Sequence, residues 1–129
     1  MTDRELITQA MHASIHAYAP YSKFRVGAAL ECQDGTVFTG CNVENAALGA
    51  SICAERCAVL KAISEGKRKF LRIAVYSQSA DYCVPCGTCR QVLCEFAPEI
   101  ELLCARSDGR YVSYRLRDLL PHSFTKDFL

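Results

Sequence analysis

The chain has 129 residues, half of them apolar, which is enough for one domain with a buried core and excludes an intrinsically disordered protein. Its formal charge is +1 and its only basic cluster lies at 67–72, so an enzyme that binds the phosphates of nucleic acid is disfavoured. No apolar run approaches the ~20 residues of a membrane helix, and the N-terminus is polar where a signal peptide is apolar.

Nine cysteines stand in a chain that we expect to be cytoplasmic and to have no membrane partner. Thiols stay reduced in that compartment, so these residues indicate metal ligands and small buried side chains rather than a disulfide framework. Their odd number also excludes complete pairing within one chain.

The predicted secondary structure alternates between helices and strands. In chain order it comprises a helix at 3–18, strands at 26–32 and 37–43, a helix at 53–65, a strand at 70–76, a helix at 86–96, strands at 100–105 and 111–114, and one helical turn at 116–120. Thr2 and Glu5 have the spacing of a capping box at the start of the first helix, and Gly66 stands where it can stop the second. Asp34-Gly35 between the first two strands predicts an antiparallel hairpin.

This order of elements predicts an α/β fold. Strands separated by helices of this length are typical of βαβ units, in which helices cover both faces of a sheet. We therefore expect three layers, α-β-α, around a mixed five-stranded sheet whose first two strands are antiparallel. No internal repeat or shift in composition divides the chain, so residues 1–129 are predicted to form a single catalytic domain.

Three cysteines have the spacing of metal ligands, because Cys53 is followed at a distance by the pair Cys86 and Cys89. Cys53 and Cys86 stand at predicted helix starts, where the helix dipole stabilises the thiolate that binds metal. Both helices follow a strand, so their N-termini are expected to meet at the same edge of the sheet. Three protein ligands leave the fourth tetrahedral position of a zinc ion open, as in a catalytic site.

Two other interpretations of these cysteines stay open at this point. The Cys86-x-x-Cys89 pair alone is also typical of a redox dithiol. A closed structural zinc site needs a fourth ligand, for which Cys57, one helical turn after Cys53, is a better candidate than Cys83.

Glu55 stands two residues after Cys53, so on a helix it points in a different direction from that ligand. This suits a group that reaches the reacting atoms without binding the metal, although an acidic residue is also favoured in any first helical turn. A Cys-x-Glu followed by Pro-Cys-x-x-Cys is the signature of zinc deaminases, in which zinc activates a water that attacks carbon 4 of cytosine. The glutamate moves protons from this water to ring nitrogen 3 and to the departing amine.

Four motifs resemble those of the small homotetrameric cytidine deaminases, in the same order and over nearly the whole chain. They are Tyr21-Ser22-Lys23-Phe24-x-Val26-Gly27-Ala28-Ala29, Asn42-Val43-Glu44-Asn45, Cys53-Ala54-Glu55-Arg56 and Pro85-Cys86-Gly87-Thr88-Cys89-Arg90-Gln91. The resemblance implies a cytidine deaminase-like fold, one zinc ion per subunit, a homotetramer, and deamination of cytidine and deoxycytidine in pyrimidine salvage.

The resemblance also implies roles for residues around the zinc ligands. Phe24 stacks on the base, the backbone of Ala54 helps to hold it, and Asn42 and Glu44 bind ribose hydroxyls. Without that context, Phe24 is more typical of a core residue, and Asn42 and Glu44 of a turn after a strand.

The resemblance implies roles for two further positions. Gln91 matches a motif position in the helix after Cys89, and Phe124 resembles the C-terminal aromatic that closes a neighbouring subunit's site. Leu48 is a departure, since a tyrosine is common there and leucine lacks its hydroxyl.

Arg56 lies three residues after Cys53, so the two share a helix face. Three thiolates around one zinc ion carry excess negative charge, which makes the metal a poorer Lewis acid. A guanidinium donating to the sulfurs offsets this charge, a role that the resemblance also implies, whereas a solvated surface arginine is the simpler alternative.

Three other functions compete with this interpretation. A deaminase acting on a cytosine-containing antibiotic does not require the Asn42-Glu44 pair. A zinc-stabilised binding module gives no reason for Glu55, and a polynucleotide-editing deaminase conflicts with the near-neutral charge.

Overall fold

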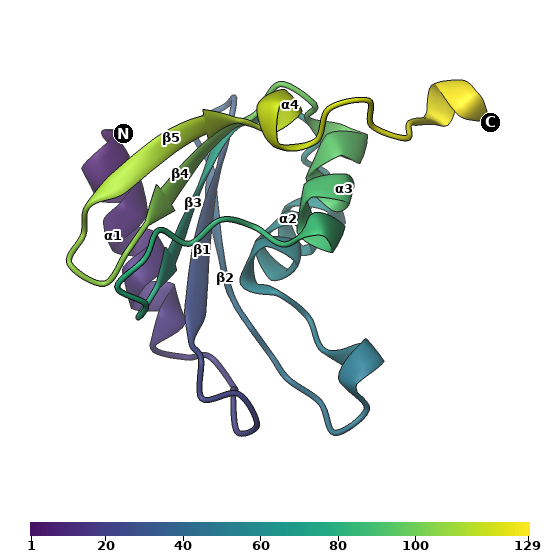
Figure 1. The fold of residues 1–129 in the computed structure, drawn as a ribbon. Helices are drawn as coiled ribbons and strands as arrows, with labels where there is room; N and C mark the ends of the chain where they lie inside the picture. Colours follow the sequence, from purple (N-terminus) through teal and green to yellow (C-terminus); the bar gives the residue numbers. More distant parts are fainter.

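The computed structural model describes all residues from 1 to 129 (Figure 1). Its elements are α1 (Asp3–Ser14), β1 (Val26–Cys32), β2 (Val37–Cys41), η1 (Leu48–Ala50), α2 (Ala54–Ser64), β3 (Phe70–Ser77), α3 (Gly87–Phe96), β4 (Glu101–Ala105), β5 (Tyr111–Arg115), α4 (Leu116–Leu119) and η2 (Lys126–Phe128). No helix has the length and apolar character needed to cross a membrane.

The five strands form one mixed sheet in the order β2-β1-β3-β4-β5. β1 pairs antiparallel with both β2 and β3, β3 pairs parallel with β4, and β5 closes the other edge antiparallel to β4. The predicted mixed five-stranded sheet is confirmed. β2 and β3 are not neighbours, however: β1 lies between them, so the connection through α2 passes over β1.

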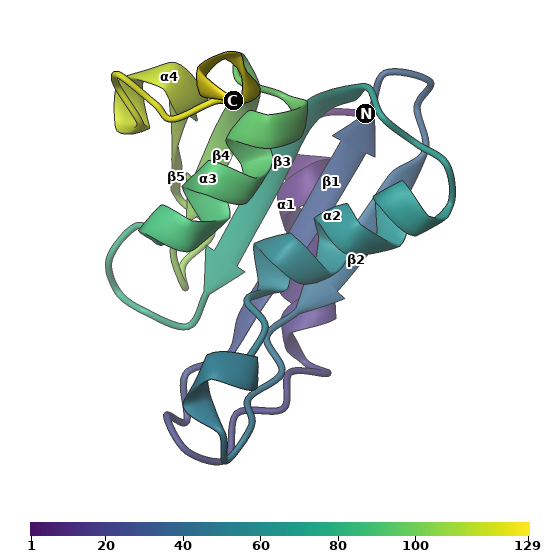
Figure 2. The ribbon, with the colours of Figure 1, turned by 90° about the vertical axis from the view of Figure 1, so that its right-hand side faces the viewer.

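Helices cover both faces of the sheet, as predicted (Figures 1 and 2). On one face, α1 buries Leu6, Ile7 and Ala10 against β1, β3 and β4. On the other face, α2 and α3 pack over a larger apolar cluster that includes Leu30 and Leu102. Successive strand residues alternate between these two clusters, because side chains of a strand point to opposite faces.

Two glycines let the helices approach the sheet closely. A Cβ on Gly27 of β1 would lie 1.9 Å from the Ala10 carbonyl oxygen of α1, and one on Gly40 of β2 would lie 2.6 Å from the Ala54 carbonyl oxygen of α2. Since these contacts are with main-chain atoms, no rearrangement of a flexible side chain would relieve the clash. Gly40 therefore sets how closely the first turn of α2 lies against the sheet.

Two predicted elements end earlier than the sequence indicated. The first helix ends at Ser14 rather than near 18, because the amide of Tyr18 donates to the Asn42 carbonyl at 2.9 Å and pairs this segment with a distant one. The second strand ends at Cys41 rather than 43, because Val43 leaves β1 and pairs with Ile52. Both differences come from long-range hydrogen bonds, which the local pattern of apolar residues does not predict.

Candidate active site

The carboxyl ends of β2 and β3 lead into α2 and α3 at one edge of the sheet. Cys53 and Cys86 are the N-cap residues of these helices, both with extended backbone, and Cys89 lies in the first turn of α3. Neither N-cap side chain caps its own helix, so both sulfurs are free for another partner. The helix N-termini place partial positive charge beside them, which favours thiolates.

The three sulfurs form the group of side chains in this structure that could hold a metal ion. Their Sγ atoms all lie within 4.8 Å of one another, and Cys53 Sγ is 3.8 Å from Cys86 Sγ. Two sulfurs bound to one tetrahedral zinc, each at ~2.3 Å, lie ~3.8 Å apart. The spacing and the donor chemistry therefore fit a zinc ion held by three thiolates.

The fourth position of this cluster has no protein ligand. Cys57 is half-buried beside Gly40, and Cys83 lies in the loop before α3, but neither belongs to the sulfur group. Burial raises the pKa of the Cys83 thiol to about 11, so it stays protonated at neutral pH. An open fourth position is the arrangement of a catalytic zinc site.

Side chains beside the sulfurs partly balance their negative charge. The neighbouring Cys89 side chain, together with Arg56 and Cys86, lowers the pKa of Cys53 to about 5, and the proximity of Cys53 raises the pKa of Cys89. Arg56 Nη2 also donates to Cys53 Sγ at 3.4 Å and to the Ser51 carbonyl. Arg56 Nε is buried without a partner, so one donor of this guanidinium is still available next to the cluster.

Glu55 follows Cys53 by two residues and lines a pocket beside the sulfur cluster, but it is not a member of the three-sulfur group. The residue is only 5% exposed. Its pKa is raised to about 7, mainly because a charged carboxylate is poorly solvated in this buried position and also because the Cys53 thiolate lies nearby. Such a group can both take and release a proton near neutral pH.

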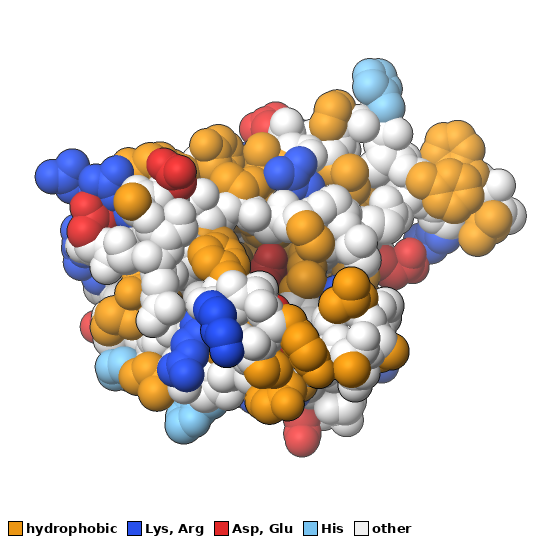
Figure 3. All heavy atoms as spheres, turned by 60° about the horizontal axis from the view of Figure 1, so that its bottom comes forward, with side chains coloured by type: hydrophobic (Ala, Val, Ile, Leu, Met, Phe, Trp, Pro, Cys, Tyr) orange, Lys and Arg blue, Asp and Glu red, His pale blue; other side chains and the backbone are white.

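The pocket beside the sulfurs has a volume of about 260 Å³. Ser22, Phe24, Val26, Asn42, Glu44, Cys53, Ala54, Glu55, Cys83, Val84 and Cys86 line it. In Figure 3, which views the molecule from this end, an acidic side chain is visible inside a hollow bordered by apolar side chains. The structure thus brings Phe24, Asn42, Glu44 and Ala54 together with Glu55 in one small, largely apolar cavity.

Asn42 and Glu44 are tied to the segment that precedes β1. Asn42 Oδ1 accepts from the Val26 amide at 2.9 Å, and its Nδ2 donates to the Phe24 carbonyl at 2.7 Å. Glu44 Oε1 accepts from the amides of Tyr21 and Ser22 at 3.0 and 3.1 Å. Hydrogen bonds from Ser22 lower the pKa of Glu44, so it is ionised at neutral pH.

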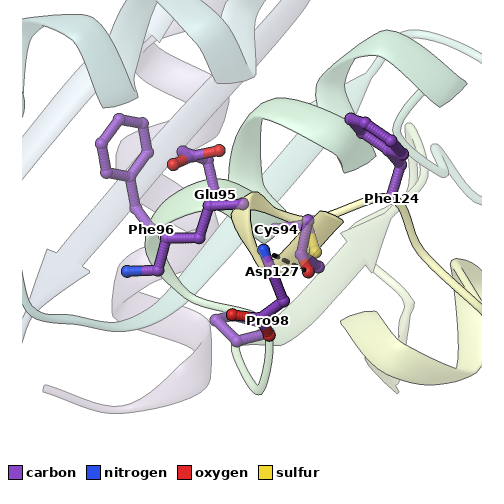
Figure 4. Close-up of a pocket in the computed structure, with 8 residues that line it drawn as sticks. Cys94, Glu95, Phe96, Pro98, Phe124 and Asp127 are labelled. Carbon is purple, nitrogen blue, oxygen red and sulfur yellow. Dashed lines mark hydrogen bonds between the residues drawn. The ribbon is translucent and has the colours of Figure 1, made fainter. Parts of the chain in front are cut away.

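Phe24 is not a core residue, since 43% of it is exposed at the pocket rim. Gln91 and Phe124 do not line the pocket beside the sulfurs. Gln91 Nε2 donates to the Phe124 carbonyl at 2.9 Å, and Phe124 stacks on Phe128 with ring centroids 5.5 Å apart. Phe124 lines a second pocket between the C-terminal tail and α3, which Figure 4 shows.

Three contributors to the site carried no role in the sequence prediction. Ser22 bonds to Glu44 and Phe24. Arg90 holds the turn before Cys86, because its Nε donates to the Pro85 carbonyl at 2.9 Å and its Nη1 to the Leu119 carbonyl at 3.0 Å. Gly40 seats the first turn of α2. A glycine inside a strand was a visible signal for Gly40, whereas nothing local marks the partners of Ser22 and Arg90.

Comparison with known proteins gives a consistent result. Residues 1–103 match a family described as "Cytidine and deoxycytidylate deaminase zinc-binding region". The chain is 43% identical over 127 residues to the cytidine deaminase of Halalkalibacterium halodurans, covering 97% of this chain and 96% of that one. The crystal structure of cytidine deaminase from Burkholderia pseudomallei superimposes with a TM-score of 0.94 at 46% identity, covering 96% of this chain and 100% of that one. A blasticidin-S deaminase from Bacillus cereus is 28% identical, covering 97% of this chain and 94% of that one.

Proposed function

This chain belongs to the cytidine and deoxycytidylate deaminase family, and from that premise we propose that it hydrolyses cytidine and deoxycytidine. Water replaces the amine at carbon 4 of the cytosine ring, which gives uridine or deoxyuridine and one ammonia. The observation that carries this proposal is a buried carboxylate, Glu55, beside a three-sulfur zinc site in a pocket that also contains Asn42 and Glu44.

Cys53, Cys86 and Cys89 would hold the zinc ion. When bound, zinc supplies a Lewis acid that lowers the pKa of a water molecule and so provides a nucleophile at neutral pH. Glu55 accepts the proton of the attacking water, passes it to ring nitrogen 3, and then helps to protonate the leaving amine. Its raised pKa of about 7 supports this role, because the same group must gain and lose a proton in one turnover.

The remaining pocket residues hold the nucleoside. Phe24 offers an aromatic face at the rim, and Ala54 offers main-chain groups next to Glu55. Asn42 and Glu44 line the other end of the pocket. There the ionised Glu44 carboxylate can accept a hydrogen bond from a sugar hydroxyl, and it repels a phosphate. This end supports a nucleoside over an antibiotic that lacks a ribose.

Arg56 tunes the metal site. Its guanidinium contacts Cys53 Sγ at 3.4 Å and withdraws negative charge from that ligand. The Nε of the same guanidinium is buried without a hydrogen-bond partner, which supports a second hydrogen bond from Arg56 to the sulfur cluster. The solvated alternative does not account for a buried donor.

Residues 1–129 act as one catalytic domain in a cytoplasmic homotetramer that serves pyrimidine salvage. Phe124 supports the tetramer, since it is 59% exposed and lines none of its own chain's active-site pocket. It is placed to reach a neighbouring subunit, and Gln91 anchors the main chain that carries it. Leu48, 76% exposed, contributes an apolar side chain without the hydroxyl that the family resemblance implies at this position.

An ultraviolet assay with purified protein tests the function. Cytidine and deoxycytidine should be deaminated. Free cytosine should be a poor substrate because it has no sugar to bind Asn42 and Glu44, and cytidine monophosphate should be a poor substrate because the Glu44 carboxylate repels its phosphate. Glu55→Gln, checked for zinc content, is the control for adventitious activity. No turnover of cytidine by zinc-loaded protein would refute the function, and equal turnover of free cytosine would refute the roles of Asn42 and Glu44.

A further inference from the structure

We propose that Ser22 is a positioning residue that joins the sugar-binding carboxylate of Glu44 and the base-stacking Phe24 into one hydrogen-bonded unit. This proposal rests on the proposed function, because it assigns a task to a residue of the same pocket. Ser22 lines that pocket, and its hydroxyl bonds both to the residue proposed to bind the sugar and to the residue proposed to stack on the base.

The carboxylate of Glu44 is largely committed to the turn that contains Ser22. Its Oε1 accepts from the amides of Tyr21 and Ser22, and its Oε2 accepts from the Ser22 hydroxyl. An ionised carboxylate has about four acceptor positions, so three are occupied and one on Oε2 is left for a substrate hydroxyl. The Ser22 hydroxyl thus determines which acceptor position of Glu44 is presented to the sugar.

The same hydroxyl fixes the backbone of Phe24. The Phe24 amide donates to Ser22 Oγ at 3.0 Å, while the Phe24 carbonyl accepts from Asn42 Nδ2 at 2.7 Å. Both main-chain groups of the stacking residue are therefore held by side chains that are themselves part of the sugar end. Sugar recognition and ring position are coupled through these bonds.

The backbone between Ser22 and Phe24 shows that the turn is held from outside. Lys23 has φ of 62°, in the left-handed region that side chains other than those of Gly, Asn and Asp rarely adopt. Its amide donates to the Ala19 carbonyl at 3.0 Å, which closes the turn. A costly conformation persists only where neighbouring contacts determine it, and the bonds to Glu44 are those contacts.

A serine in a surface turn is most often satisfied by its own loop. Ser22 differs because its hydroxyl reaches Glu44, which is 22 residues away in the chain. If the Ser22 hydroxyl only stabilised its own turn, its removal would have little effect on substrate binding. A positioning role predicts a selective loss of nucleoside affinity with the metal site intact.

Steady-state kinetics of Ser22→Ala with cytidine test the proposal. KM should rise roughly tenfold, as expected for loss of a hydrogen bond to a charged group, while kcat and zinc content change little. Ser22→Thr keeps the hydroxyl at an exposed position and should restore most of the affinity. Ser64→Ala, which removes an exposed serine hydroxyl at the end of α2, is the matched control and should leave KM unchanged.

A double-mutant cycle with Glu44→Gln distinguishes positioning from general damage to the turn. If Ser22 acts through Glu44, the rise in KM for the double variant is well below the product of the two single rises. Fully multiplicative effects, an unchanged KM in Ser22→Ala, or a Ser22→Thr variant as impaired as Ser22→Ala would each overturn the proposal. These outcomes are distinct from failure of the proposed function, in which the wild-type protein would not deaminate cytidine at all.

Discussion

The metal half of the pocket (Cys53, Glu55, Cys86 and Cys89) and its sugar half (Ser22, Phe24, Asn42 and Glu44) lie side by side but are held by different interactions. The metal half is carried by the N-termini of two helices that pack on a buried sheet. The sugar half is carried by two loops joined through side-chain hydrogen bonds to the backbone. Substitutions in the first half should therefore abolish metal or chemistry, whereas those in the second should weaken binding by degrees.

Removing a zinc ligand gives the largest expected effect. Cys86→Ala should lose both zinc and turnover, because two thiolates do not hold the ion in a catalytic geometry. Elemental analysis of purified protein measures the metal. Cys104→Ala, at a buried cysteine outside the sulfur group, is the control and should keep its zinc. A Cys86→Ala protein with a full zinc complement would show that the ion is bound elsewhere.

Replacing the buried carboxylate separates the chemistry from the metal. Glu55→Gln should retain zinc but lose activity by roughly 10⁴-fold or more, since an amide does not transfer protons and this residue serves several steps. The measurement is kcat on zinc-loaded protein. Glu65→Gln, the same change at an exposed position after α2, should be silent. Substantial turnover by Glu55→Gln would exclude a proton-transfer role.

Packing beneath the metal half can be tested without touching a ligand. Gly40→Ala should destabilise the protein by roughly 1–3 kcal/mol, because the new methyl group meets main-chain atoms of α2. It should also weaken zinc retention, since that contact positions the turn carrying Cys53. Denaturant unfolding and a chelator titration measure the two effects. Gly49→Ala is the matched control, because a Cβ there meets nothing within 4 Å.

The sugar half should respond to Glu44→Gln with a rise in KM of roughly tenfold for cytidine and with unchanged zinc content. The amide is neutral and does not reproduce both the bonds to the Tyr21–Ser22 turn and the bond to the substrate. A parallel loss of zinc in this variant would show that the two halves are not separately supported.

The smallest expected effect is at the contact between Arg56 and Cys53. Arg56→Ala should keep its fold and shift the pH dependence of kcat/KM upward by roughly one unit or less, because the ligand sulfurs regain negative charge. Arg56→Lys should restore this only in part, since an ammonium lacks the planar fork. A profile that does not move in metal-loaded Arg56→Ala would show that the charge is balanced elsewhere.

The metal half could be predicted from the sequence because its geometry is local. The predicted start of a helix also locates the cysteine at that start. Two helices that each follow a strand place their N-termini at the same edge of the sheet. Glu55 is only two residues after Cys53, so their relative direction follows from helix geometry alone.

The support of the sugar half could not be predicted in the same way. The bonds of Glu44 to Ser22 and the left-handed backbone of Lys23 depend on which loops meet after folding. The end of α1 was missed for the same reason, because its last turn is replaced by pairing between Tyr18 and Val43. The sequence motifs of the sugar half identified the residues that line the pocket but did not predict the hydrogen bonds that hold these residues in place.

The spacing of the zinc ligands has a thermodynamic consequence. Cys53 and Cys86 are 33 residues apart, and a shared ion between them closes a loop that includes all of α2 and β3. A link of this length restricts the unfolded chain far more than the folded one, much as a disulfide does. Zinc should thus act as a reversible cross-link whose binding free energy adds to folding stability, so that the resistance of this enzyme to denaturation depends on metal supply.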